Sequence, residues 1–318
     1  MMQKTILFFL LFTTGSYAQI KGCTDRFASN FDPKATENDG HCWYASAKLS
    51  PVFSAKLSDS IQRTSGLIYF DNLLWTHNDH FDDRLYGLDL KGKIKKKIKF
   101  AELKTKDWEE ISQDSLYIYI GDFGNNNKGN RKDLRIIRIQ KETILTTNPV
   151  MDTIAFSYSD QSNFKLQKAN TTNFDCEAFI VQKDVIYLFT KEWSNQRTSV
   201  YALPNKAGVY TAEFKGSIDA QGLITGAVAL PSKKGVVLCG YSKTLQPFVL
   251  LLYGYEKDSF WSGNSRKIKI RLPFHQIEGI TTADGKLFYL TNETTIRKPF
   301  INTPQQIHTI DLSSYLNP

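Results

Sequence analysis

One short pattern occurs five times between residue 60 and the end of the chain, and it restricts the folds open to this sequence. In the clearest copy, an acidic and a small residue open the apolar run 177–181, a turn follows, and a second run, 185–192, ends in polar residues. The copies open at Ser65, Glu109, Glu177, Thr225 and Glu278, at intervals of 44, 68, 48 and 53 residues. Repeats of this kind that contain several short strands are typical of propeller blades. The sequence therefore predicts an all-β, five-bladed β-propeller.

The segments between the copies predict the outer strands of the blades. Runs such as 84–90 and 134–139 have the length and composition of strands, and no segment sustains a helical period of 3.6 residues. The longest interval, 68 residues, leaves a sixth blade open as an alternative, although no sixth opening phrase occurs there. Residues 51–57 alternate without a hairpin partner of their own. We expect this strand to complete the last blade of a propeller at 46–318, which would remove two exposed sheet edges.

The five opening residues predict a metal site. The first strand of a propeller blade is the innermost, so these residues should form a ring around the axis. Three carboxylates on one axis repel one another unless a cation lies between them, and carboxylate and hydroxyl oxygens suit calcium. The expected calcium ligands are Ser65, Glu109, Glu177, Thr225 and Glu278. The alternative is that the carboxylates pair with basic residues or are hydrated in an empty tunnel.

The second strand of each blade returns to the same face, so its last polar residues should surround the ring. These residues are Asn78, Asp79, Asp122, Lys191, Glu192, Asn292 and Glu293. His77 could act as an acid–base group or as a hydrogen-bonded structural histidine. The nearby aromatic residues could form a ligand platform or pack between blades: Trp75, Trp108 and Trp193.

The sequence lacks the familiar catalytic motifs, and its charge pattern gives little indication of nucleic-acid binding. It contains no Gly-x-Ser-x-Gly elbow, His-Glu-x-x-His helix, phosphate loop or paired Cys-x-x-Cys. The net charge is +8, but six lysines lie within 91–99, where they are typical of a protected outer edge strand. We therefore expect no nucleic-acid partner.

Residues 1–18 predict a secretory signal peptide. Lys4 gives a positive start, 6–12 form an apolar core, and 16–18 form a small-x-small cleavage site. The expected mature chain begins at Gln19 and is secreted or periplasmic. No later run is long and uncharged enough to span a bilayer, so we expect no membrane anchor and no appended sorting domain.

Residues 19–45 predict a separate small module rich in Asp, Asn and Gly. Cys23 and Cys42 bracket it, and in an oxidising compartment we expect them to pair, with a stabilisation of about 3 kcal/mol. The segment resembles the short Gly-Cys-Thr-Asp…Asp-Gly-Ser-Cys modules of many secreted bacterial proteins. Cys176 and Cys239 lie in adjacent blades, and the sequence leaves their pairing open. Four side chains of the module could hold a second calcium ion or cap turns: Asp25, Asn30, Asp32 and Asp39.

Three segments carry a family resemblance. Residues 74–79, 107–111 and 118–126 resemble the Trp-Thr-His-Asn-Asp, Asp-Trp-Glu-Asp and Gly-Asp-Ile-Gly-Asp-Asn signatures of an uncharacterised family of secreted bacterial propellers. The likeness covers about residues 60–295 and implies no particular activity.

A more distant resemblance concerns the five opening residues. Their order of Ser, Glu, Glu, hydroxyl and Glu is similar to that of the calcium-activated nucleotidases, or soluble apyrases. Those proteins are five-bladed propellers that hold one calcium ion in the tunnel and hydrolyse nucleoside diphosphates. The resemblance implies that the same five residues bind calcium here. The apyrases' Asp-Asp-Arg-Thr-Gly is replaced by Asn-Asp-His-Phe-Asp at 78–82, so the metal site need not bring the chemistry with it.

Two classes of function follow, and the fold does not decide between them. One is a calcium-dependent hydrolase of phosphoanhydrides or phosphoesters, in which Asp79 or Glu192 positions water, Lys191 neutralises a phosphate and His77 transfers protons. The other is a non-catalytic secreted propeller with structural calcium that binds a glycan or a protein on its top face. The sequence does not predict the substrate or the oligomeric state.

Overall fold

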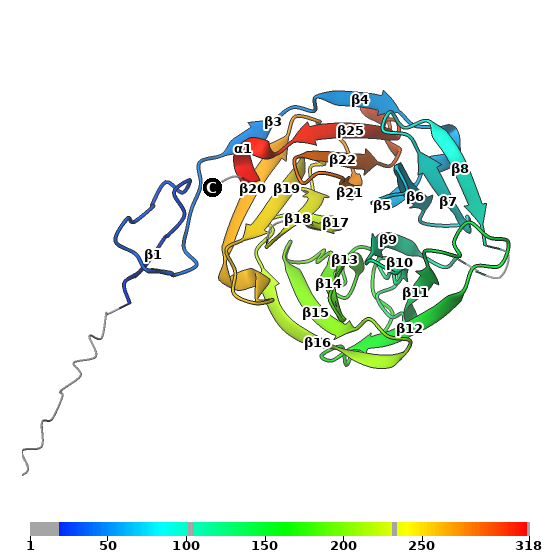
Figure 1. Cartoon of the computed structure of the whole chain (residues 1–318), viewed down its shortest axis with the longest axis horizontal. Helices are drawn as coiled ribbons and strands as arrows, with labels where there is room; N and C mark the ends of the chain where they lie inside the picture. The colour runs from blue at the N-terminus through cyan, green and yellow to red at the C-terminus, as the bar shows by residue number, and fades with distance from the viewer. Residues whose placement is uncertain (1–18, 101–102, 104, 231–233, 317–318) are drawn as a thin grey trace, which may run out of the picture.

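The five repeats form five blades around one axis, which Figure 1 shows as a ring. This computed structural model of the protein describes residues 19–100, 103, 105–230 and 234–316. The innermost strand of each blade contacts those of its two neighbours, so the ring is closed. The inner strands are β5 (Thr64–Phe70), β9 (Trp108–Gln113), β13 (Cys176–Gln182), β17 (Leu223–Ala229) and β21 (Ile277–Thr282). The predicted all-β, five-bladed propeller is confirmed.

Antiparallel strands follow each inner strand outward. Blade 1 continues with β6 (Leu73–Asn78), β7 (Arg84–Leu88) and β8 (Ile94–Lys99). Blade 2 continues with β10 (Tyr117–Asp122), β11 (Leu134–Gln140) and β12 (Met151–Tyr158). Blade 3 continues with β14 (Val185–Thr190), β15 (Thr198–Pro204) and β16 (Gly208–Ile218). Blade 4 continues with β18 (Gly235–Tyr241), β19 (Pro247–Tyr253) and β20 (Asn264–Ile270). Blade 5 continues with β22 (Leu287–Asn292) and β25 (Gln306–Asp311).

The core is divided among the contacts between blades. One cluster of buried apolar side chains lies between each pair of neighbouring blades. Between blades 3 and 4, for example, Phe189 and Phe248 belong to one cluster. Strands covered on both faces need apolar side chains at successive positions, which explains the unbroken apolar run of β14.

The N-terminal strand closes the ring, as the sequence predicts. Strand β4 (Phe53–Lys56) pairs with β25, with Phe53 opposite Thr309 and Lys56 opposite Gln306. Blade 5 therefore combines strands from both ends of the propeller. A second segment that the sequence does not predict, β3 (Ala47–Leu49), pairs in parallel with β20 and extends blade 4.

The longest interval between repeats contains no sixth blade. Its residues lie in blade 2, in the turn region 141–150 and in the two long loops 123–133 and 159–175. Strand β12 also pairs in parallel with β16, which joins blades 2 and 3 into one sheet of eight strands.

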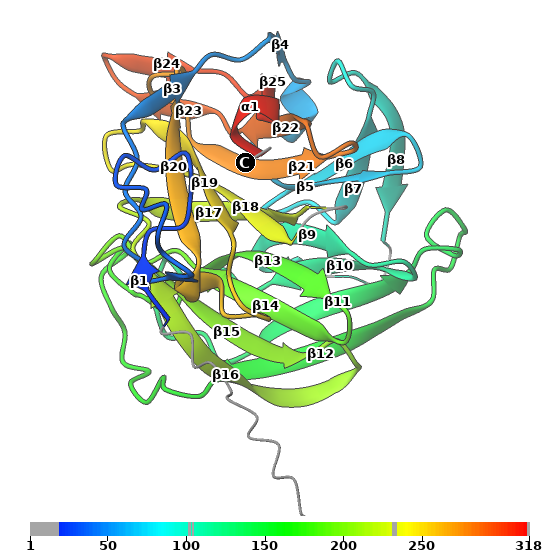
Figure 2. The ribbon, with the colours of Figure 1, turned by 60° about the vertical axis from the view of Figure 1, so that its left-hand side comes forward.

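A few short elements complete the propeller. A hairpin, β23 (Thr295–Arg297) and β24 (Ile301–Thr303), projects from blade 5 (Figure 2). Two 3-10 turns, at Asp59–Ile61 and Phe260–Ser262, and helix α1 (Ser313–Leu316) are the other elements. Within the described ranges, no helix is long and apolar enough to cross a membrane.

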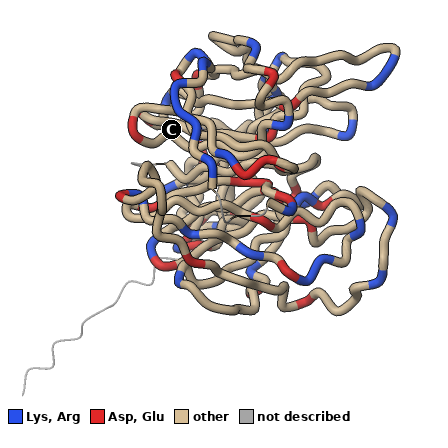
Figure 3. The backbone as a smooth tube through the Cα atoms, turned by 90° about the vertical axis from the view of Figure 1, so that its right-hand side faces the viewer, with Lys and Arg blue, Asp and Glu red and all other residues tan. Residues whose placement is uncertain are grey.

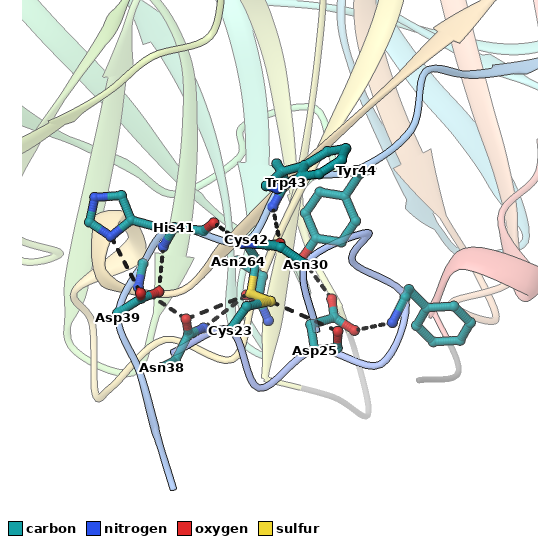
Figure 4. The surroundings of a disulfide bond; sticks show 12 residues. Cys23, Asp25, Asn30, Asn38, Asp39, His41, Cys42, Trp43, Tyr44 and Asn264 are labelled. Atoms are coloured by element: carbon teal, nitrogen blue, oxygen red, sulfur yellow. Dashed lines mark hydrogen bonds and ion pairs between the residues drawn. A yellow bond between two sulfur atoms is a disulfide. The ribbon is translucent and has the colours of Figure 1, made fainter. Parts of the chain in front are cut away.

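The small N-terminal module lies against the outer edge of blade 4 (Figure 1). Its strands β1 (Lys21–Gly22) and β2 (Glu37–Asn38) pair in parallel, and the predicted Cys23–Cys42 disulfide is present (Figure 4). Asp25 joins the module to the propeller, because its Oδ2 accepts hydrogen bonds from Tyr44 at 2.6 Å and from Tyr253 of β19 at 2.5 Å. The predicted signal peptide lies outside the described residues.

Of the module's other polar side chains, Asp32 and Asp39 make the contacts expected of turn caps, whereas Asn30 joins two separate segments. Oδ1 of Asp32 accepts from the backbone N–H two residues on at 2.9 Å, and Oδ1 of Asp39 does the same. Asn30 bonds to the backbone of His41 and Trp43. Elsewhere in the chain, Cys176 and Cys239 are buried and are not joined by a disulfide.

One carboxylate links three blades at the axis. The residue after each opening residue is small in four blades and glutamate in the fifth: Gly66, Glu110, Ala178, Gly226 and Gly279. Glu110 is fully buried, and its carboxylate accepts backbone N–H groups of Leu67 in blade 1 at 3.3 Å and Ala227 in blade 4 at 2.9 Å. A Cβ atom on Gly66 would lie 2.8 Å from Glu110 Oε1 and 2.5 Å from the backbone nitrogen of Ile111. The small residues therefore leave the space that Glu110 fills.

Replacing Glu110 by Gln should destabilise the protein. Glutamine keeps the side-chain size but turns one acceptor oxygen into an NH₂ group that faces a backbone N–H. Burying such an unsatisfied group costs about 1–3 kcal/mol. Denaturant unfolding should show this loss, whereas Glu142→Gln in an exposed turn should change the free energy of unfolding by less than about 0.5 kcal/mol. Equal stability of the two variants would contradict the assigned role of Glu110.

Candidate functional site

A β-bulge frees the predicted ring residue from the strand ladder in four of the five blades. In blade 3, Cys176 lies opposite Thr190 and Ala178 opposite Phe189, so Glu177 between them has no partner in β14. The same register shift leaves three other opening residues unpaired: Glu109, Thr225 and Glu278. In blade 1 the shift follows Ser65 directly. Bulges redirect side chains and often occur beside functional sites, so this device positions the ring.

A cavity of about 460 Å³ lies at the end of the propeller where these bulges meet. Seven predicted residues line it: Ser65, Asp79, Glu109, Glu177, Lys191, Glu278 and Glu293. Its wall also contains residues that the sequence did not assign to a site: Arg63, Asn126, Asn170, Tyr241, Lys243, Gln276 and Arg297. Trp193 lines the cavity, whereas Trp75 and Trp108 are buried in the apolar core.

Three buried glutamates from three inner strands share the floor of the cavity. Glu109, Glu177 and Glu278 are each at most 6% exposed. Burial raises the pKa of all three carboxyls, and the neighbouring carboxylate of Glu177 raises the pKa of Glu109 further. The pKa of Glu278 rises to about 8, and its buried Oε2 has no hydrogen-bond partner among the described residues.

Lys191 is the cation buried beside this acidic floor. Its Nζ lies 3.1 Å from Glu177 Oε1 and above the rings of Trp193 and Tyr241, at 5.0 and 5.3 Å from their centroids. Burial alone would lower the pKa of Lys191, but the carboxylates of Glu177 and Glu278 outweigh burial and raise its pKa well above the ordinary value. The lysine therefore pairs with one of the three buried carboxyl groups.

The two ring hydroxyls connect adjacent inner strands. Ser65 Oγ donates to the carbonyl of Glu109 at 2.5 Å, and Thr225 Oγ1 donates to the carbonyl of Ile277 at 2.5 Å. Ser65 lines the cavity, but Thr225 is fully buried and does not. Their donor hydrogens are thus used within the fold, and oxygen lone pairs are what they can offer to a cation.

Asp79 belongs to an ionic network on the cavity wall. Its two oxygens accept hydrogen bonds from Nε and Nη2 of Arg63, both at 2.5 Å, and Oδ2 is 3.2 Å from Nδ1 of His80. The other ring nitrogen of His80 lies 3.0 Å from Asp107, and these two carboxylates raise the pKa of His80 to about 10, against the effect of burial. Burial would raise the pKa of Asp79, but His80 and Arg63 lower it. Asp79 is therefore a fixed carboxylate whose oxygens are already engaged.

Six predicted site residues do not line the cavity: His77, Asn78, Asp122, Glu192, Thr225 and Asn292. Asp122 is held by Arg131 at 2.5 Å and by Arg135 at 2.9 Å, and Glu192 Oε1 accepts from Ser199 at 2.5 Å. Both carboxylates are thus committed to ion pairs or hydrogen bonds within the blades.

His77, Asn78 and Asn292 also make their contacts inside the fold. Burial lowers the pKa of His77 to about 4, and its ring meets Trp108 edge-on at 5.6 Å. Asn78 donates to Asp82 at 2.7 Å, and the Oδ1 of Asn292 is 2.9 Å from Nε2 of His308.

Three cavity residues that the sequence did not assign to the site have a fixed spacing from the repeat. Arg63, Leu223 and Gln276 line the cavity, and each stands two positions before an opening residue. Arg63 and Gln276 directly precede β5 and β21, and Leu223 begins β17. The repeat that placed the ring could therefore have placed these residues as well.

Comparisons with known proteins give remote structural likenesses. No family model matches the sequence, and no curated protein matches it. The chain is similar to the solved structure of a soluble aldose sugar dehydrogenase from Escherichia coli in the apo-form, with 7% identity, a TM-score of 0.45 and coverage of 81% of this chain and 99% of the other. It is also similar to a streptogramin B lyase structure, with 9% identity, a TM-score of 0.41 and coverage of 81% and 97%. Likenesses this remote carry no argument about activity.

The raised carboxyl pKa values predict how stability depends on pH. The pKa rises from 4.5 to about 8 at Glu278 and to about 7 at Glu293, chiefly through burial. Between pH 4.5 and about pH 8 the folded state binds more protons than the unfolded chain, so the free energy of unfolding falls as pH rises. With a chelator present, the protein should melt at a lower temperature at about pH 8 than at about pH 5.5.

The double variant Glu278→Gln/Glu293→Gln is the matched control for this measurement. It lacks both titrating carboxyls, so calorimetric melting temperatures should depend less on pH. A wild-type melting temperature that rises over the same interval would contradict the assignment.

Proposed function

We propose that this chain is a secreted propeller that binds calcium at its axis and a small polar ligand in the cavity above it. The observation that carries the proposal is the excess of buried carboxyl groups over buried cations on the cavity floor. Glu109, Glu177 and Glu278 line that floor together, and Lys191 pairs with Glu177. Among the described residues, no three acidic, histidine or cysteine side chains lie close enough to hold a metal ion as they stand, so calcium binding requires these carboxylates to approach one another. Buried ionised carboxylates are stable only when they are paired or when they coordinate a metal.

The donor atoms suit calcium. The candidate ligands are the carboxylates of Glu109, Glu177 and Glu278 with the hydroxyl of Ser65, all of which line the cavity. Calcium prefers such hard oxygen ligands and tolerates irregular geometry. The unpartnered Oε2 of Glu278 and the bulges that free the glutamates from the ladder support this set. Thr225 lies outside the cavity wall and is left out of the proposed set.

The upper cavity supports binding of a polar ligand. Asn126, Asn170 and Gln276 offer amide groups, and Trp193 offers an aromatic face. Sites that recognise small polar molecules combine these groups, since amides fix hydroxyls and a ring packs against an apolar face. Export of the chain is proposed from the N-terminal sequence pattern and agrees with the Cys23–Cys42 disulfide.

Hydrolysis of a phosphoanhydride or phosphoester is the second candidate. Asp79 and Lys191, two of the predicted catalytic residues, line the same cavity as the acidic floor. Calcium would supply polarisation of a phosphoryl oxygen when bound. Both oxygens of Asp79 are engaged by Arg63, which favours a positioning or structural role for that carboxylate.

Calcium binding is tested by titration calorimetry of chelator-stripped protein. Glu278→Gln should weaken binding by about tenfold or more, because calcium affinity follows the charge of the ligand set. The exposed Glu142→Gln should leave affinity unchanged. In wild type, calcium at a thousandfold excess over Kd should stabilise the fold by about 4 kcal/mol. Titrations without heat, together with an unchanged melting temperature, would refute the metal proposal.

A phosphate-release screen tests the second candidate. Nucleotides and sugar phosphates would be incubated with wild type, Asp79→Asn and Glu192→Gln, with and without calcium. A hydrolase at this cavity should lose activity in Asp79→Asn and keep it in Glu192→Gln, because Asp79 lines the cavity and Glu192 does not. If wild type releases no phosphate from any substrate, the hydrolase candidate is discarded and the binding proposal stands.

A further inference from the structure

Two long loops form a basic wall beside the cavity. The wall consists of residues 123–133, between β10 and β11, and residues 159–175, between β12 and β13. Four lysines on it are exposed: Lys128, Lys132, Lys165 and Lys168. Long loops in a compact domain are usually functional or disordered. These two loops contact each other, which gives them a defined conformation.

Hydrogen bonds hold the two loops together. The backbone N–H of Gln167 donates to the carbonyl of Lys128 at 3.0 Å, and that of Asn170 donates to the carbonyl of Asn126 at 2.8 Å. Nζ of Lys132 lies 4.9 Å from the centroid of the Phe164 ring. The wall is therefore one built surface rather than two independent loops.

The lysines of the wall have no ion-pair partner among the described residues. The neighbouring carboxylates are already used, because Asp133 pairs with Lys106 and Arg131 and Asp160 accepts from Tyr201 at 3.0 Å. Figure 3 shows Lys and Arg at several loop tips of the propeller. Four positive charges without ion pairs on one surface favour an anionic partner.

Amide side chains of the wall line two cavities. Asn126 and Asn170 face the cavity at the axis. A second cavity of about 460 Å³ is lined by Asn127 and Asn130, together with Asp107 and Asp133. Amide side chains both donate and accept hydrogen bonds, as sugar hydroxyls do.

We propose that this wall is a docking surface for an anionic polysaccharide, whose acidic groups lie on the lysines while its sugar rings reach the two cavities. The inference rests on the proposed ligand-binding cavity and names its ligand class. A nucleic acid fits less well: Phe164 is half-buried beneath Lys132, so the wall presents no exposed aromatic ring for stacking bases.

The test compares two charge-reversal variants of the mature chain in calcium buffer. The wall variant carries Lys128→Glu, Lys165→Glu and Lys168→Glu. The matched control carries Lys91→Glu, Lys93→Glu and Lys99→Glu, three exposed lysines in and beside outer strand β8. Both variants change the net charge equally, so only the wall variant tests a local surface. Fluorescence anisotropy would measure binding of labelled dextran sulfate, neutral dextran and a single-stranded oligodeoxynucleotide.

Wild type should bind dextran sulfate more tightly than either other probe. The wall variant should bind dextran sulfate at least about tenfold more weakly. Its affinity should also fall less steeply with salt concentration, by a slope that corresponds to about two fewer ions released on binding. The control variant should stay within about twofold of wild type. Lys→Gln at the three wall positions should give an intermediate affinity, and melting temperatures would verify that all variants fold.

Three results would overturn the inference: equal losses in both variants, oligonucleotide binding as tight as dextran sulfate binding, or neutral dextran binding as tight as dextran sulfate binding. Calcium titration of the same proteins separates this test from the proposed function. The wall variant should retain wild-type calcium affinity because its substitutions lie outside the acidic floor. A wild type that binds dextran sulfate but not calcium would refute the metal site alone.

Discussion

The burial of carboxyl groups at the axis is the constraint on which the rest of the structure depends. An ionised carboxylate away from water costs several kcal/mol unless hydrogen bonds or a cation offset that cost. Glu110 meets this condition with backbone N–H groups from its own strand and from blades 1 and 4. Glu278 does not, because its Oε2 has no hydrogen-bond partner among the described residues. The axis thus carries a carboxylate satisfied by the fold and, beside it, an acidic floor that the fold leaves open to a cation.

Backbone geometry explains why Glu110 is satisfied by the fold and Glu278 is not. Each bulge removes one residue from the ladder while the residue after it stays in the ladder, and the bulges at Glu109, Glu177 and Glu278 turn the freed side chain toward the cavity. Glycine or alanine at that next position in four blades brings the inner strands close together and leaves room for one carboxylate, Glu110. Closure of the ring by β4 and β25 keeps the five strands in register around the cavity. The site is therefore a product of the whole ring rather than of one blade.

Much of this arrangement could be predicted from the sequence because the repeat is strong. The opening phrases placed Glu109, Glu177 and Glu278 on one axis, and the lone strand at 51–57 was expected to close it. The side-chain contacts could not be predicted, since they depend on neighbours distant in sequence. Asp122 ends its strand as Asp79 does, yet its arginine partners hold it within the blade and away from the cavity. No periodic pattern in the sequence marks the parallel pairing of β12 with β16 or the two wall loops. The sequence therefore left a sixth blade open as an explanation of the 68-residue interval between the second and third repeats.

The central claim is that a cation completes the acidic floor. Crystals of the calcium-loaded protein, measured for anomalous scattering, test it most directly. The account predicts one anomalous peak among the carboxylates of Glu109, Glu177 and Glu278, with calcium–oxygen distances of about 2.3–2.6 Å. A map with no such peak, in which the ammonium group of Lys191 or a water molecule occupies that position, would contradict it.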